Sequence, residues 1–324
     1  MADKQRSAVT VVVALGANVG VAVLKLIAGL LSGSGALLSE AAHSVGDTST
    51  QILLLTAVRR SERPADAEHP FGYGKERYFW SLLAAFGILV SGAAFSVYQG
   101  VHTITTPPES DSYAWVNYVV LGIALVLEGT SLLQATRQVR TEAEEHEHSV
   151  AAQLRGSDDP TPRAVFTEDL TAVIGIFLAA LGVGLHQLTG SAVWDGAASL
   201  AIGVLLAVVA VLLGRACRGL LIGRQADPRL VRAIWEWLEE QPEVDDLVDL
   251  QTMLTGTDRV LVCARVDFVD SYTAGDLEKA CMRIEGGLRE RCRDIDEVFV
   301  QPVPRSDPQL RERVLRRYGR ILAD

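Results

Sequence analysis

Six long apolar stretches are the feature of this sequence that most constrains its fold. They cover residues 9–31, 36–58, 79–101, 114–135, 162–188 and 193–214. Each is long enough to cross about 30 Å of hydrocarbon as a helix. Because the bilayer interior offers no water to satisfy backbone polar groups, a helix is the structure expected for each stretch. The sequence therefore predicts an all-α, six-helix transmembrane domain over residues 1–214.

The short connections between these stretches differ in charge. Lys and Arg residues precede the first stretch, lie between the second and third and between the fourth and fifth, and follow the sixth. The opposite connections, residues 32–35, 105–112 and 189–192, contain neither Lys nor Arg. Basic connections are retained on the cytoplasmic side of a membrane. We therefore expect a multi-pass protein of the inner or plasma membrane, embedded in the lipid bilayer with both termini cytoplasmic.

A more polar segment follows the last apolar stretch. Residues 228–240 have the apolar period of a helix, whereas residues 260–268 alternate like a strand with one buried face. Further strands are predicted over 247–254 and 296–302, and further helices over 273–292 and 307–322. The first five elements follow the order αββαβ of a small α+β ferredoxin-like sandwich. We expect this cytoplasmic domain over residues 215–324, with a trailing C-terminal helix.

The overall charge excludes one class of partner. The formal net charge is −10, and nucleic-acid binding needs a basic face that an acidic chain lacks. The sequence also contains no GxxxxGK[ST] phosphate loop, which argues against an ATP-driven pump. We expect no nucleic acid as partner, no organic cofactor and no enzymatic reaction.

Ionisable residues inside the apolar stretches are the candidates for function, because a charge at bilayer depth is costly unless it faces a cavity or a partner. In the second stretch, Glu40, His43 and Asp47 have the spacing i, i+3, i+7 and therefore lie on one stripe of a helix. An imidazole nitrogen and a carboxylate oxygen four residues apart can converge on one metal ion. The alternative interpretation is a polar network between helices that binds no metal.

The fifth stretch adds two adjacent carboxylates, Glu168 and Asp169. Adjacent helical residues point about 100° apart, so we expect only one of them to share an ion with the second stretch, and we favour Asp169. The alternative is that both stabilise the N-terminal turn of their helix. Lys25, Glu128 and Asp195 in other stretches are interpreted as structural. Lys25 can extend its ammonium group to the interface, and Asp195 can cap its own helix.

Three motifs carry a family resemblance. They are SEAAHSVGDTSTQ at 39–51, HPFGYGKER at 69–77 and WDGAASLAIGVLL at 194–206. With six spans and an αββαβ domain, they resemble the cation diffusion facilitator (cation efflux) family, and most of all its zinc transporter 9 branch. The resemblance implies a homodimeric, proton-coupled antiporter that exports Zn²⁺ from the cytoplasm, or Mn²⁺, Fe²⁺ or Co²⁺ in some branches. It also places the central metal site on His43, Asp47 and Asp169.

The sequence departs from the family pattern at two sites. Most members carry His or Asp four residues before the aspartate of the fifth span, where this chain has Val165. Glu168, Glu40 or a water molecule would then supply the missing ligand. The connection between the second and third spans has Asp66 but Tyr73, where some zinc exporters bind an additional metal ion with Asp and His. We expect no metal ion in that connection.

The segment from residue 216 onward contains no histidine, whereas zinc-sensing members of the family bind metal there through His and carboxylates. We therefore expect a dimerisation module. The alternative function is a membrane metal sensor or scaffold that binds cations without transporting them.

Overall fold

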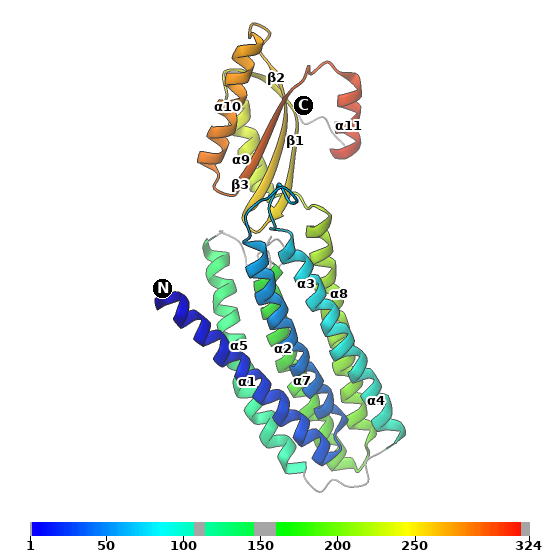
Figure 1. The fold of residues 1–324 in the computed structure, drawn as a ribbon. Coiled ribbons are helices and arrows are strands. Elements are labelled where there is room, and N and C mark those ends of the chain that lie inside the picture. Colours follow the sequence, from blue (N-terminus) through cyan, green and yellow to red (C-terminus); the bar gives the residue numbers. More distant parts are fainter. Residues whose placement is uncertain (1, 107–113, 146–159, 319–324) are drawn as a thin grey trace. The chain divides into compact units, whose positions relative to one another are not determined.

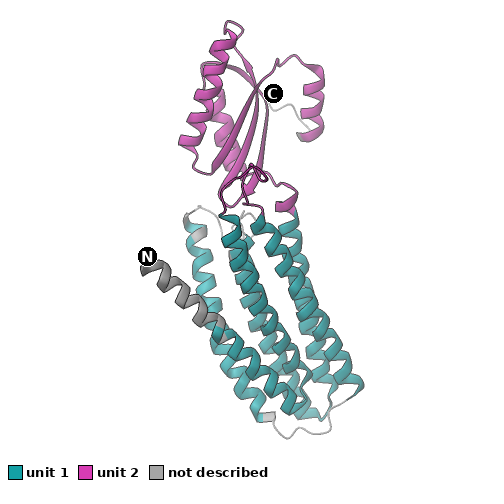
Figure 2. Cartoon of the chain, in the orientation of Figure 1, with its two compact units in different colours: residues 1–62, 76–218 teal, residues 63–75, 219–324 magenta. Residues whose placement is uncertain are grey.

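The computed structural model describes residues 2–106, 114–145 and 160–318 (Figure 1). The chain divides into two compact units (Figure 2). Unit 1 comprises residues Met1–Glu62 and Glu76–Arg218, and unit 2 comprises Arg63–Lys75 and Gly219–Asp324.

Unit 1 consists of long helices that pack against one another. They are α1 (Ala2–Ser32), α2 (Gly35–Ser61), α5 (Ala114–Glu145), α7 (Pro160–Thr189), α8 (Val193–Ile222), and an interrupted helix made of α3 (Glu76–Gly87), the π-helix η1 (Ile88–Ala94) and α4 (Phe95–Thr105). Helix α2 contacts α1, the interrupted helix and α7, whereas α5 contacts α1 and α7 (Figure 1). Residues of α2 therefore have neighbours on several other helices.

Four helical segments of the described chain are long and apolar enough to cross a membrane. They are Glu76–Thr105, Trp115–Thr141, Arg163–Thr189 and Val193–Ile222. The described apolar part of α1, Asn18–Ser32, is shorter, and the apolar sequence of α2 is interrupted by buried polar residues such as Glu40, His43 and Asp47. The chain is thus a multi-pass helical membrane protein, and crossings by α1 and α2 stay a prediction.

Unit 1 is apolar outside and polar at several places inside. Large side chains such as Leu30, Trp115 and Val126 are exposed on the helices. Lys25 and Glu40, in contrast, are among the fully buried residues. An exposed apolar surface of this extent is what a lipid environment accommodates, and buried ionisable groups inside it are the candidates for a functional site.

The π-helix η1 interrupts a stretch that the sequence predicts as one regular helix. Within it, the Ser91 hydroxyl donates to the carbonyl oxygen of Gly87 at 2.7 Å. A hydroxyl bonded to the carbonyl four residues earlier competes with the regular ladder and favours such distortions. Gly92 in the same segment lies against Leu206 of α8, where an added Cβ would be 3.0 Å from the leucine Cδ1.

Unit 2 has the predicted order of elements. These are α9 (Pro228–Glu239), β1 (Val244–Gly256), β2 (Arg259–Phe268), α10 (Ala274–Arg291), β3 (Ile295–Pro302) and α11 (Pro308–Tyr318). The sheet order is β1-β2-β3, with β1 antiparallel and β3 parallel to β2. The predicted alternation of β2 is confirmed, because every second residue from Val260 to Phe268 is buried. Residues 319–322 of the predicted last helix lie outside the described residues.

Helices cover both faces of this sheet. Figure 1 shows α9 and α10 on one side and α11 on the other. Leu310 and Val314 of α11 pack on Val248 of β1, while Ile234 of α9 and Ile284 of α10 are fully buried. The trailing helix is therefore part of the packed unit.

The connection between α2 and α3 belongs to unit 2 by its contacts. Gly74 lies against the end of β1, where an added Cβ would come within 2.5 Å of the carbonyl oxygen of Thr255. Only glycine permits this approach of two backbones. The connection lies within the 1–214 domain that the sequence predicts, and in the structure it groups with the α/β elements.

Candidate functional site

His43 and Asp47 lie one turn apart on the buried side of α2. Their Nδ1 and Oδ1 atoms are 3.2 Å apart, and the two residues are only 2% and 8% exposed. This approach is not a hydrogen bond, because Asp47 Oδ1 has no hydrogen-bond partner in the described part of the chain. His43 Nε2, the other ring nitrogen, has none there either. Buried polar atoms are normally paired. Two unpaired atoms of metal-ligating type on adjacent turns are therefore suited to a cation.

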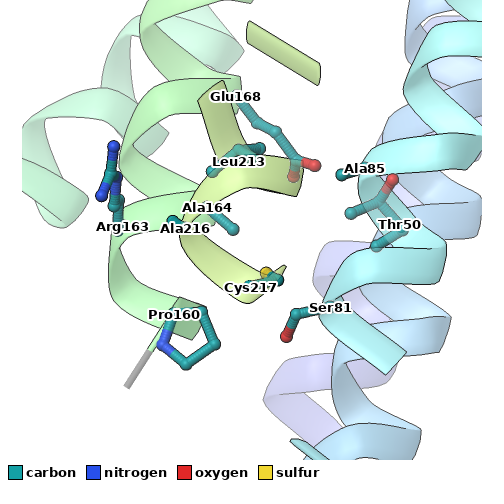
Figure 3. A pocket seen from close by; sticks show the side chains of 11 residues that line it. Thr50, Ser81, Ala85, Pro160, Arg163, Ala164, Glu168, Leu213, Ala216 and Cys217 are labelled. Carbon is teal, nitrogen blue, oxygen red and sulfur yellow. The ribbon is translucent and has the colours of Figure 1, made fainter. Parts of the chain in front are cut away.

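The two carboxylates of α7 face different neighbours. Asp169 Oδ2 accepts a hydrogen bond of 2.8 Å from the Ser131 hydroxyl of α5. Glu168 lines a small cavity with Thr50 of α2 and Cys217 of α8 (Figure 3). Its Oε1 atom is buried and has no hydrogen-bond partner among the described residues. The sequence favoured Asp169 as the group that meets the second stretch, but the structure places Glu168 on the side of α2.

These residues do not form one compact ligand shell. Among the described residues, no three His, Cys, Asp or Glu side chains form a group that could hold a metal ion. The structure brings His43 and Asp47 together and leaves Glu168 and Asp169 as separate carboxylates. Val165, one turn before Asp169, packs against the apolar core of unit 1.

Glu40 belongs to a different arrangement. Lys25 of α1 places its Nζ 3.1 Å from Glu40 Oε2, 2.8 Å from Ser44 Oγ and 3.8 Å from Glu128 Oε1 of α5. Both Lys25 and Glu40 are 0% exposed. The expectation that Lys25 extends to the membrane interface is therefore wrong. Its charge is compensated inside the protein by groups from two other helices, a pairing for which the sequence contains no signal.

Asp195 caps a helix other than its own. It lies in the first turn of α8, and its Oδ1 accepts a hydrogen bond of 2.7 Å from Ser34 Oγ. Its Oδ2 accepts from the backbone nitrogens of Gly35 at 2.5 Å and Ala36 at 3.4 Å. These nitrogens begin α2, so Asp195 stabilises the N-terminus of the helix that carries His43.

Asp66 and Tyr73 bond to each other in the connection between α2 and α3. The Tyr73 hydroxyl donates to Asp66 Oδ2 at 2.7 Å. The centroid of its ring is 4.3 Å from the ring centroid of His69 and 4.3 Å from Arg63 Cζ. This hydrogen bond lowers the pKa of Asp66 and raises the pKa of Tyr73. The carboxylate that could have served a second metal ion is thus engaged by a phenol.

Comparison with known proteins adds the following similarities. Residues 11–222 match the family model of the cation efflux transmembrane domain. The human proton-coupled zinc antiporter SLC30A9, mitochondrial, is 35% identical over 75% of this chain and 43% of its own length. Metal tolerance protein C4 of Arabidopsis thaliana is 34% identical over 82% of this chain and 58% of its length. Magnetosome protein MamB of Magnetospirillum gryphiswaldense is 26% identical over 89% of this chain and 91% of its length. The chain thus spans less than half the length of SLC30A9.

Proposed function

The chain belongs to the cation efflux, or cation diffusion facilitator, family of transporters, and we propose that it is a proton-coupled antiporter of Zn²⁺. The observation that carries the proposal is the buried pair of His43 and Asp47, with an unpaired nitrogen and an unpaired oxygen. The name of the similar human protein, a proton-coupled zinc antiporter, supports the choice of metal and of counter-ion.

The proposed ligands are His43 and Asp47 of α2 with Glu168 and Asp169 of α7. Nitrogen and oxygen ligands without sulfur suit tetrahedral Zn²⁺, and they also accept Mn²⁺, Fe²⁺ or Co²⁺. Glu168 is the natural replacement for the ligand missing at Val165, because it lies on the α2 side of α7. Glu40 would be recruited only by leaving Lys25. Binding would draw the ligands of α2 and α7 closer than they lie without an ion.

The proposed exchange of protons for metal follows from the chemistry of these ligands. Carboxylates and imidazole coordinate a dication only in their deprotonated forms. Protons arriving from the far side of the membrane therefore displace the metal ion, and metal arriving from the cytoplasm displaces protons. No covalent step is needed, and the two cargoes share one set of side chains.

The proposal includes an architecture for the whole chain. The helical part over residues 1–214 would cross the inner or plasma membrane six times, with α1 and α2 among the crossings and both termini in the cytoplasm. Residues 215–324 would form a ferredoxin-like cytoplasmic domain through which two copies dimerise. The uneven distribution of Lys and Arg and the αββαβ order support this arrangement.

Reconstitution into liposomes with a proton gradient tests the proposal. We expect Zn²⁺ flux coupled to proton flux, abolished by Asp47→Ala and unchanged by Asp270→Ala, which removes an exposed carboxylate of unit 2. Unchanged flux with Asp47→Ala would refute the site. Zn²⁺ binding without any flux would instead support a sensor or scaffold.

A further inference from the structure

Four side chains form a buried polar cluster between α1, α2 and α5, which we call the Lys25 cluster. The Lys25 ammonium is surrounded by Ser44 Oγ at 2.8 Å, Glu40 Oε2 at 3.1 Å and Glu128 Oε1 at 3.8 Å. Lys25 and Glu40 have no exposed side-chain surface, and the Glu128 side chain is 13% exposed. The ammonium is thus a desolvated cation held by oxygen atoms from two other helices.

The oxygens around Lys25 are those of a hard-cation site. Carboxylates and hydroxyls are the ligands of Mg²⁺, Ca²⁺ and Mn²⁺, which also retain water molecules when few protein ligands are present. When both are ionised, the two carboxylates carry two negative charges, whereas a Lys25 ammonium supplies one positive charge. A divalent ion in place of the ammonium would therefore neutralise the cluster.

A further oxygen of the cluster is unpaired. Glu40 Oε1 is buried and has no hydrogen-bond partner within the described chain. It lies against Gly175 of α7, so close that a Cβ at that position would overlap it. The absence of a side chain at Gly175 makes room for this carboxylate, and α7 therefore helps to hold Glu40 in place.

We infer that Lys25 is a tethered cation that fills an oxygen-lined site beside the His43 and Asp47 pair and excludes a second divalent ion from it. Lys25 is then a specificity-determining residue, because it leaves the nitrogen-containing pair as the place where a metal ion binds. The inference goes beyond the proposed function, since the ammonium excludes an ion whether or not the neighbouring pair transports one.

Counting bound Mn²⁺ tests this inference. The purified full chain in detergent is titrated with Mn²⁺, and free Mn²⁺ is measured by electron paramagnetic resonance. We expect Lys25→Met to bind one more Mn²⁺ per chain than the unmodified protein, and Lys25→Arg, which keeps the charge, to bind no more. The additional ion is lost in the double variant Lys25→Met with Glu40→Gln. Equal Mn²⁺ counts for Lys25→Met and the unmodified protein would overturn the inference.

Two further proteins serve as controls for the Mn²⁺ count: a second variant at Lys25 and a variant that lacks the His43 and Asp47 pair. Lys25→Gln removes the charge but keeps a donor for Ser44, and it is expected to bind the same additional ion. If either variant unfolds without metal, Mn²⁺ must restore the folded protein, and a failure to do so contradicts the inference. In a background of His43→Ala with Asp47→Ala, the additional Mn²⁺ is retained. Loss of Zn²⁺ binding in that background concerns the proposed function alone.

Discussion

Lys25 and Glu40 form a fully buried ion pair across two helices, with 3.1 Å between Nζ and Oε2, although they are 15 positions apart in the sequence. Each charge is desolvated, so each depends on the other for compensation. The pair also joins α1 to the helix that carries His43 and Asp47. Its strength therefore bears on both the stability of unit 1 and the geometry of the proposed metal site.

Removing the ammonium leaves the buried Glu40 carboxylate and the partly buried Glu128 carboxylate without compensation. Breaking a buried ion pair from one side typically costs about 3–5 kcal/mol, and we expect Lys25→Met to lower the free energy of unfolding by that amount in the presence of a chelator. Lys279→Met, at an exposed position of α10, is the control and should change little. Denaturation in detergent measures the difference. A loss equal to that of the control would show that the pair contributes nothing.

Gly175 should tolerate no side chain. Its added Cβ would overlap Glu40 Oε1, and a shift of this buried carboxylate would disturb the hydrogen bond of 3.1 Å that Oε2 accepts from Lys25. Overpacking of this kind costs about 1–3 kcal/mol, so Gly175→Ala is expected to lower the thermal unfolding midpoint. Gly122→Ala on α5 is the matched control, because its Cβ would meet no atom within 4 Å. A similar response of both variants would argue against the tight fit at Gly175.

Asp195 should contribute to the stability of α2 although it belongs to α8. Loss of an N-terminal cap costs about 0.5–2 kcal/mol, and Asp195→Ala removes acceptors from Ser34, Gly35 and Ala36 together. We expect faster hydrogen exchange of the first amides of α2 in this variant, measured by mass spectrometry. Unaltered exchange there, with changes confined to α8, would mean that Asp195 caps its own helix.

The two carboxylates of α7 should differ in their effect on Zn²⁺ affinity. Glu168 lies on the side of α2, whereas Asp169 bonds to Ser131. Both are proposed ligands, and we expect Glu168→Gln to weaken Zn²⁺ binding more than Asp169→Asn, because the Asp169 carboxylate is shared with the Ser131 hydroxyl. Calorimetric titration compares the two isosteric variants directly. The reverse order would restore Asp169 as the principal ligand of α7.

The Asp66 and Tyr73 hydrogen bond predicts a pH dependence of stability. The hydrogen bond lowers the pKa of Asp66 in the folded protein. Its contribution to folding stability is therefore present above the ordinary aspartate pKa of about 3.9 and is lost as the pH falls through the lower pKa of the folded state. The same hydrogen bond raises the pKa of Tyr73 in the folded protein. Its contribution to folding stability is therefore present below the ordinary tyrosine pKa of about 10 and is lost as the pH rises through the higher pKa of the folded state.

The variant Tyr73→Phe removes this hydrogen bond and keeps the ring. The difference in free energy of unfolding between this variant and the unmodified protein should not vary with pH around neutrality, and it should shrink at strongly acidic and at strongly basic pH. Denaturation over a series of pH values measures it, with Tyr272→Phe as the control because Tyr272 is half-buried in the connection between β2 and α10. A difference that does not vary with pH would mean that the phenol contributes through packing alone.

Periodicity explains what could be predicted for unit 2 and for α2. The alternation along β2 predicts its buried residues correctly, and the apolar period over 228–240 predicts the helix α9, because these patterns depend on one element and its own backbone geometry. The same rule places His43 and Asp47 on one stripe, and the structure brings them within 3.2 Å of each other. Polar side chains on that stripe also explain why α2 is not among the helices that are apolar enough, by composition alone, to cross a membrane.

The sequence alone determined that this chain is a helical membrane protein with an α/β segment, since apolar length and period are local properties. Only the tertiary structure decided that Lys25 is buried against Glu40 and Glu128, that Asp195 caps α2, and that Glu168 lies on the side of α2. The physical reason is that the helical period determines which residues share a face of one helix. Which faces of different helices meet depends on how all of them pack together.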